Sequence, residues 1–257
     1  MPIRCRTLIV TLTSATTLLV PTLSEAQVTL IPDGQWRYLL TAGANISSGN
    51  NKAGSMNLAA EGALQTLDDK WTWTAKADRA KNAGVATTER YGLRTQYNRD
   101  LSPDWFGFGS GETLRDKLAN IAARHSLASG VGRHVWREDS GYFDMSIGLG
   151  FSHDRYVKPT RIGGTPRDTY GRLELVLTEE SSHRLTDSTS LRQKFSLYPD
   201  LRESGRYRAV LDTGLTVAMT ETMNITAGLS YRHDSKPGPD IKKGDAMFVT
   251  GVSFRLD

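Results

Sequence analysis

The stretch Tyr142 to Phe151 reads YFDMSIGLGF and carries apolar side chains at every second position. Phe143 begins this apolar row and Phe151 ends it, whereas Asp144, Ser146 and two glycines fill the alternate positions. A period of two indicates a β-strand with one apolar face. That face points either into a protein core or into lipid, and the rest of the sequence bears on which of the two it is.

Residues 1–26 have the features of a secretory signal peptide. Arg4 and Arg6 precede an apolar run that is too short and too rich in Thr and Ser for a membrane anchor, and small residues lead up to Ala26. Cleavage after Ala26 removes Cys5, the single cysteine, so we expect no disulfide and no thiol chemistry in the mature chain. Residues 27–257 then form one domain.

Alternation of apolar and polar residues recurs along this domain and predicts twelve strands. The clearest rows begin with Trp36-Tyr38-Leu40, Trp71-Trp73-Ala75 and Leu173-Leu175-Leu177. The fifth segment (104–114) and the sixth (120–136) are the least regular. Their predicted outward rows are Phe106-Phe108 and Ile121-Ala123-Leu127-Val131.

The connections between these segments alternate in length. Short turns such as LDDK, LSPD and LTDS follow the even-numbered segments, and longer polar stretches such as KNAGVATTE and VKPTRIGGTPRDT follow the odd-numbered ones. An even number of strands with short turns on one side is typical of an outer-membrane barrel, with both termini on the periplasmic side. All five tryptophans fall near the short turns, as an interfacial aromatic belt requires. The sequence therefore predicts an all-β, antiparallel, up-and-down transmembrane β-barrel of about twelve strands.

If the apolar rows face lipid, the opposite faces line a lumen that is rich in charge. A soluble barrel would have to bury these groups at a cost of several kcal/mol for each unpaired charge, so we exclude that class. The predicted lumen-lining charges, in which cations outnumber anions, are Arg37, Glu61, Lys76, Asp78, Arg94, Arg124, Asp144, Arg172, Glu174, Arg192, Lys194, Arg208, Asp212 and Arg232.

Two interpretations of this lumen remain open at this point. One is a narrow channel with a weak anion preference, and the other is a lumen closed by arginine–carboxylate pairs. We expect Asp144 to pair with Arg37 or Arg124, and Gly148 and Gly150 to face the lumen. The long stretch after Tyr156 either plugs the barrel or stands outside it.

Ser181, His183 and Glu179 share one strand face and are the single constellation that could serve a lipid hydrolase. They lie in the polar run EESSH, for which a solvated turn is the better interpretation. We therefore predict no enzyme activity and no catalytic, cofactor or metal site. The net charge of +4 is spread along the chain, which argues against nucleic acid as a partner. The expected partners are outer-membrane lipid, lipopolysaccharide and, during biogenesis, the barrel-assembly machinery.

Several stretches resemble the YdiY-like salt-induced outer-membrane proteins. They are GANISSGNNKAGSMNL (43–58), WTWTAKA (71–77), YNRDLSPDWFGFG (97–109), RHSLASGVGRH (124–134) and the closing TGVSFRL. This resemblance implies an outer-membrane barrel, supplies no catalytic residues, and suggests induction by salt or osmotic stress. The C-terminus departs from the terminal aromatic residue that is common in such barrels, since it ends in Leu256-Asp257.

Overall fold

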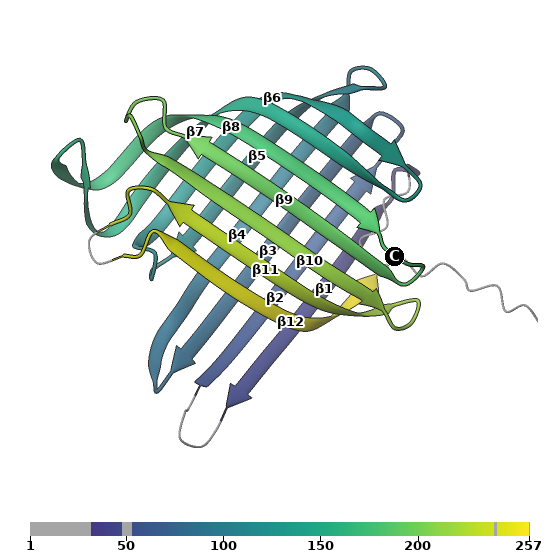
Figure 1. Ribbon diagram of the computed structural model, residues 1–257, viewed down its shortest axis with the longest axis horizontal. Helices are drawn as coiled ribbons and strands as arrows, with labels where there is room; N and C mark the ends of the chain where they lie inside the picture. Colours follow the sequence, from purple (N-terminus) through teal and green to yellow (C-terminus); the bar gives the residue numbers. More distant parts are fainter. Residues whose placement is uncertain (1–31, 48–52, 239–240, 257) are drawn as a thin grey trace, which may run out of the picture.

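The computed structural model describes residues 32–47, 53–238 and 241–256. The predicted signal peptide, residues 1–26, lies outside the described residues. The described part of the chain forms twelve antiparallel strands, each paired with its neighbours in sequence, and β1 meets β12 to close the barrel (Figure 1). The predicted fold class, a closed antiparallel barrel of twelve strands, is confirmed.

The strands differ considerably in length, from 11 residues in β9 to 22 in β7. Their bounds are β1 Trp36–Ser47, β2 Ala53–Gln65, β3 Asp69–Asn82, β4 Val85–Asp100, β5 Trp105–Asp116, β6 Ile121–Glu138, β7 Gly141–Ile162, β8 Thr165–Arg184, β9 Thr189–Pro199, β10 Tyr207–Ala218, β11 Met223–Asp234 and β12 Gly244–Leu256.

The turns after the even-numbered strands lie at one end of the barrel, together with the C-terminal end of β12 (right in Figure 1). We call this the short-turn end and the opposite one the long-loop end. The prediction that every connection at the long-loop end is long was wrong. The β3–β4 and β7–β8 connections are tight turns at 83–84 and 163–164, and the polar residues beside them extend the strands.

Of the two alternatives for the stretch after Tyr156, it stands outside the barrel and does not plug it, although it forms strands and not a loop. It continues β7 to Ile162 and returns as β8, and this hairpin projects at the far left of Figure 1. Gly163 and Gly164 make the turn with φ of 56° and 86°, a backbone region that glycine adopts without steric cost. The register shifts between Arg155 and Thr160, which bends the hairpin at this point.

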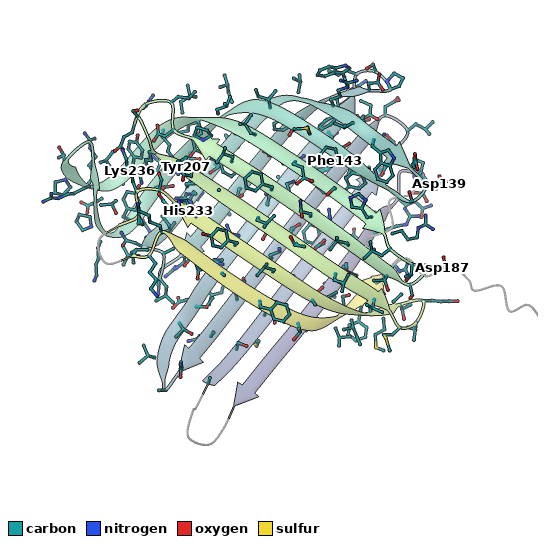
Figure 2. All side chains as sticks on the ribbon, viewed as in Figure 1. Asp139, Phe143, Asp187, Tyr207, His233 and Lys236 are labelled. Atoms are coloured by element: carbon teal, nitrogen blue, oxygen red, sulfur yellow. The ribbon has the colours of Figure 1, made fainter. Side chains whose placement is uncertain are left out.

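The two faces of the wall have opposite character. Outward side chains are mostly apolar and exposed, as Leu127 (71% exposed), Leu149 and Phe248 show. Inward side chains include arginines and carboxylates that are almost completely buried, such as Arg172 (1% exposed). Figure 2 shows side chains projecting from both faces, with Asp187 at the short-turn end and Lys236 at the other. This distribution is the reverse of the one in a soluble globular protein.

Strand β5 departs from the predicted orientation, because Phe106 and Phe108 point into the barrel. Both rings are buried, and Phe108 lies opposite Asn98, on the inner face of β4. The space for them comes from glycines on β6 and β7: a Cβ at Gly132 would lie 2.1 Å from Phe106, and one at Gly148 would lie 2.9 Å from Phe108. The predicted outward row Phe106-Phe108 was wrong because these rings occupy the volume that the glycines leave.

Ile121 is a second correction, since it is buried and does not face outward. The register of β6 against β7 shifts between Ile121 and Ala123, so one extra residue reverses the alternation there. Ala123 and Leu127, beyond this bulge, face outward as predicted.

We predict that Gly132→Val destabilises the barrel by about 1–3 kcal/mol, because the new side chain overlaps the Phe106 ring. Urea unfolding of the refolded protein in detergent measures the loss. Gly109→Val is the matched control, since nothing lies within 4 Å of a Cβ at that outward position. An unchanged unfolding midpoint for Gly132→Val would contradict the packing described here, and adding Phe106→Ala should restore part of the lost stability.

Candidate functional site

The candidate site is the interior of the barrel. The strand register puts the charged residues singled out from the sequence on the inner face: Arg208 is paired with Tyr198, for example, and Asp212 with Lys194. The remaining members are Arg37, Glu61, Lys76, Asp78, Arg94, Arg124, Asp144, Arg172, Glu174, Arg192 and Arg232, which alternate with outward residues on their strands.

Further inward charges escaped the sequence prediction, namely Lys70, Arg90, Glu112, Asp116, Asp154 and Glu180. Lys70 and Glu180 were missed because the polar runs LDDK and EESSH were interpreted as turns. Arg90 and Asp154 were missed because they lie beyond the apolar rows of β4 and β7. These strands extend beyond their apolar rows, and the two-residue period continued into the polar ends would have found the charges. Because most of the added groups are carboxylates, the excess of cations over anions in the lumen is smaller than predicted.

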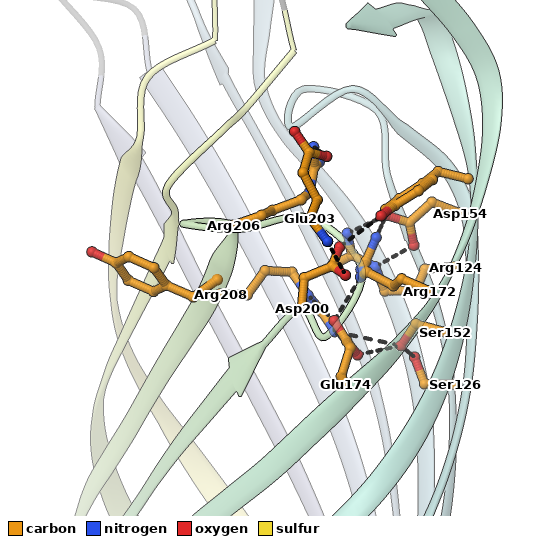
Figure 3. Close-up of polar contacts among 12 residues, drawn as sticks. Arg124, Ser126, Ser152, Asp154, Arg172, Glu174, Asp200, Glu203, Arg206 and Arg208 are labelled. Atoms are coloured by element: carbon orange, nitrogen blue, oxygen red, sulfur yellow. Dashed lines mark hydrogen bonds and ion pairs between the residues drawn. The ribbon is translucent and has the colours of Figure 1, made fainter. Parts of the chain in front are cut away.

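The densest part of the interior is an arginine network made by Arg124, Asp154, Arg172, Glu174 and Arg208 (Figure 3). Arg124 donates two hydrogen bonds to Asp154, at 2.6 and 2.7 Å. Arg172 connects Asp154 at 2.8 Å with Glu174 at 2.6 Å. Arg208 reaches Glu174 from β10, at 2.8 Å. These contacts join β6, β7, β8 and β10 on the inside of the wall.

Two hydroxyl groups complete the network. Ser152 donates to Glu174 at 2.6 Å and lies 2.8 Å from Ser126 (Figure 3). Asp154 and Glu174 are no more than 2% exposed, so hydrogen bonds from charged arginines replace the water that would otherwise solvate each carboxylate. Such a cluster is strongly held when complete and costly when one member is missing.

The expected partner of Asp144 was wrong. Asp144 accepts a hydrogen bond at 2.8 Å from His134, which is also stacked on Phe106. Arg124 is bound by Asp154, and Arg37 donates to Asp33 at 3.0 and 2.7 Å. These hydrogen bonds from Arg37, together with one from the Gln35 backbone, lower the pKa of Asp33 to about 2.

A second set of inward side chains spans the lumen from one wall to the other, and we call them the transverse contacts. Lys70 on β3 approaches Glu180 on β8 at 3.9 Å, and Arg192 on β9 approaches Glu61 on β2 at 3.6 Å. Two polar contacts lie deeper between β4 and β9. They join Arg94 to Tyr198 at 3.4 Å and Lys194 to Gln96 at 3.3 Å.

Glu180 is the centre of the transverse contacts. Lys194 approaches it at 2.7 Å and Arg192 at 3.7 Å, and Tyr142 donates a hydrogen bond to it at 2.9 Å. Lys70 lies 5.1 Å above the Tyr142 ring. Cations from two opposite walls therefore share one carboxylate near the middle of the lumen.

Loops cover the long-loop end of the barrel. Lys236, after β11, binds Glu203 of the β9–β10 connection at 3.1 Å, and Arg90 on β4 binds Asp245 on β12 at 2.8 Å. A Cβ at Gly238 would lie 2.5 Å from the Asn120 amide, so the chain after β11 reaches the β5–β6 turn on the far side of the barrel. These contacts narrow the mouth at this end.

In the described part of the chain, the short-turn end is more open than the long-loop end. A cavity of about 280 Å³ lies there, lined among others by Gln65, His134, Tyr142 and Ser182. A cavity of about 20 Å³ lies next to Lys70, Phe106 and Glu180, which is room for about one water molecule. The passage therefore narrows sharply at the transverse contacts.

Glu179, Ser181 and His183, the residues considered for hydrolysis, face outward on β8. His183 stacks on Trp136 at 5.5 Å, and Glu179 accepts a hydrogen bond from Gln193 at 3.1 Å. Within the described residues, neither Ser181 nor His183 makes a side-chain hydrogen bond, so the geometry does not join a nucleophile to a base.

Over the described ranges, no group of three or more His, Cys, Asp or Glu residues is arranged to hold a metal ion. In the same part of the chain, no helix is long and apolar enough to cross a membrane.

Residues 40–255 match the family described as protein of unknown function, DUF481. The chain belongs to this family. No curated protein matches the chain in sequence, and no named relative supports the narrower YdiY-like assignment.

Solved structures show what the DUF481 barrel is similar to in fold. A NanC porin is 10% identical, with a TM-score of 0.50, and the match covers 86% of this chain and all of the porin. The translocator domain of the autotransporter NalP from Neisseria meningitidis is 16% identical, with a TM-score of 0.46 and coverage of 86% and 88%. At these identities the likeness to the NanC porin concerns the fold alone.

We predict that Glu174→Gln lowers the free energy of unfolding by about 3–5 kcal/mol, because it removes a buried charge from Arg172 and Arg208 together. Urea unfolding in detergent is the measurement. Glu61→Gln serves as the control, since Glu61 is partly exposed and has one 3.6 Å contact, and it should cost below about 1 kcal/mol. Equal losses in the two variants would show that the network does not contribute as described.

Proposed function

We propose that this protein is an outer-membrane β-barrel of a Gram-negative envelope whose lumen is closed to solutes. Three features support the membrane location: the apolar outer face, the charged inner face, and tryptophans near the short turns. Neighbouring rings form an aromatic cluster there, with Trp36 5.6 Å from Trp71 and Tyr38 6.3 Å from Trp73. In this proposal residues 1–26 direct export, both termini are periplasmic, and the barrel-assembly machinery inserts the chain.

The observation that carries the closed state is the set of transverse contacts. Lys70, Glu180 and Arg192 come from β3, β8 and β9 and meet inside the barrel, where the adjoining cavity measures about 20 Å³. A hydrated ion would have to displace these paired side chains to pass. The arginine network and the loops at the long-loop end narrow the path further.

A narrow channel is the second candidate function. The cavity of about 280 Å³ gives solutes an entrance at the short-turn end, and Lys76 remains exposed on the inner face of β3. A channel would require the transverse contacts to separate.

Neither candidate function involves catalysis, and an outer-membrane lipid hydrolase is the alternative from another class. It would need His183 to leave Trp136 and to reach Ser181. The resemblance to YdiY-like proteins supports a role in the envelope during salt or osmotic stress, which measurement of the protein level after a salt shift would test.

Membrane insertion predicts heat-modifiable migration. The refolded mature chain should migrate differently on a gel before and after boiling, because a closed barrel resists detergent unfolding until it is heated. Identical migration under both conditions, together with failure to insert into lipid vesicles, would refute the membrane barrel.

The closed lumen predicts very low conductance in planar bilayers for the wild-type barrel. The variant Glu180→Ser/Arg192→Ser removes one partner from each of the contacts Lys70–Glu180 and Arg192–Glu61, with no net change in charge, so it should show clear ohmic steps that the wild type lacks. Thr178→Ala/Ser196→Ala is the matched control, because these inward neighbours bind each other at 3.3 Å along one wall. Large steps in the wild type would favour the open channel instead.

A further inference from the structure

A cluster of basic side chains interrupts the apolar outer face of the barrel. It consists of Arg115 on β5, His125 on β6, and His153 and Arg155 on β7, and we call it the β5–β7 patch. All four residues are exposed. They lie on the outside of the wall, opposite to the inward arginine network on the same strands.

The register shows how these residues are grouped. His125 is paired directly with His153, and Ala123 is paired with Arg155. Arg115 lies where β5 meets the bulge of β6, between the pairs Leu114–Arg124 and Asp116–Ile121. The two arginines thus flank the small residue Ala123, separated by two strand spacings, or about 10 Å. His125 and His153 form a second row, two residues nearer the short-turn end than Ala123 and Arg155.

The patch lies at a specific depth along the barrel. Ten positions separate Phe143, near the short-turn end, from His153 on the same face of β7. At about 3.3 Å per residue and a tilt of about 40°, this corresponds to roughly 25 Å along the barrel axis. That is the height of the apolar band of an outer-membrane barrel. His153 therefore lies at the outer boundary of the hydrocarbon region, and Arg155 lies just beyond it.

Among the described residues, no ion pair holds the basic groups of the patch. Among the described residues, Arg115, His153 and Arg155 make no hydrogen bond or ion pair, and His125 lies 3.1 Å from the Thr113 hydroxyl. The nearby carboxylate of Glu89 is bound by Lys117 at 3.0 Å, and it attracts Arg115 without forming an ion pair with it. The inward arginines, in contrast, are paired with carboxylates inside the barrel.

The opposite wall has a different surface at the long-loop end. Tyr207 on β10 stacks on His233 of β11 at 5.5 Å, and Tyr231 lies two residues before it (Figure 2). An aromatic surface of this kind suits any lipid interface. The β5–β7 patch differs from this surface because two arginines and two histidines lie close together on it, and this grouping points to a particular ligand.

We propose that the β5–β7 patch binds a phosphate group carried by a lipid headgroup of the outer leaflet. The proposal rests on the membrane location proposed above. Arg115 and Arg155 would bind the phosphate oxygens through the planar N–H donors of their guanidinium groups. His153 would donate a further hydrogen bond from the short-turn side. Ala123 and Gly171, small residues beside the patch, leave room for the headgroup. The acyl chains would then lie along Leu127, Leu149 and Phe151.

Native mass spectrometry of the refolded chain tests this proposal, with bisphosphorylated lipid A and the same lipid after dephosphorylation as probes. The wild type should retain the phosphorylated lipid at least about tenfold better, as expected from charge-assisted hydrogen bonds. Arg115→Gln/Arg155→Gln should abolish this selectivity. The matched control Arg99→Gln/Arg133→Gln removes two exposed outward arginines at the short-turn end of the same wall and should retain it.

Three results would overturn the patch as a lipid site. They are equal retention of both lipids by the wild type, full selectivity in Arg115→Gln/Arg155→Gln, and displacement of the lipid by millimolar inorganic phosphate. The wild-type comparison decides the question even if the double variant does not refold. Heat-modifiable migration and insertion into vesicles are measured on the same samples. Loss of lipid selectivity with normal insertion therefore refutes the patch alone, whereas failed insertion refutes the proposed membrane location.

Discussion

The pairing of inward-facing charges is the constraint on which the rest of this structure depends. The alternation of the strands places these charges inside the barrel, where they must neutralise one another. An arginine or carboxylate removed from water costs several kcal/mol unless charged hydrogen-bonding partners replace the water. Asp154 and Glu174 are almost fully buried and are satisfied by three arginines from three strands. The contact of Arg208 on β10 with Glu174 on β8 also joins two strands that share no backbone ladder.

The same pairing shapes the lumen. In the arginine network the contacts run along the wall from β6 to β10, whereas in the transverse contacts they cross from β2, β3 and β4 to β8 and β9. The first arrangement connects strands within one wall, and the second is the basis of the closed lumen that we propose. Because Glu180 contacts cations from both sides, the proposed closure depends on this carboxylate.

Packing of aromatic rings supplements the ionic contacts. Phe106 and Phe108 occupy the space above glycines of β6 and β7, and Phe106 supports the His134 ring that binds Asp144. Because a glycine has no side chain, it leaves space on the inner wall in which a ring from another strand packs. On the outer face, the basic residues of the β5–β7 patch are exposed, and no ion pair within the described residues holds them.

The sequence by itself determined the fold class, the twelve strands, and the side of the wall that most residues face, because a period of two is a local property of the chain. It also contained the inward charges, and those missed, such as Lys70 and Glu180, lay in strand ends that look like turns. Only the tertiary structure decided which charges meet. Asp144 binds His134 where Arg37 or Arg124 was expected, since pairing depends on register and on side chains from distant strands. The orientation of Phe106, Phe108 and Ile121 was likewise decided by neighbouring glycines and by a bulge in β6, which no alternation pattern within one strand records.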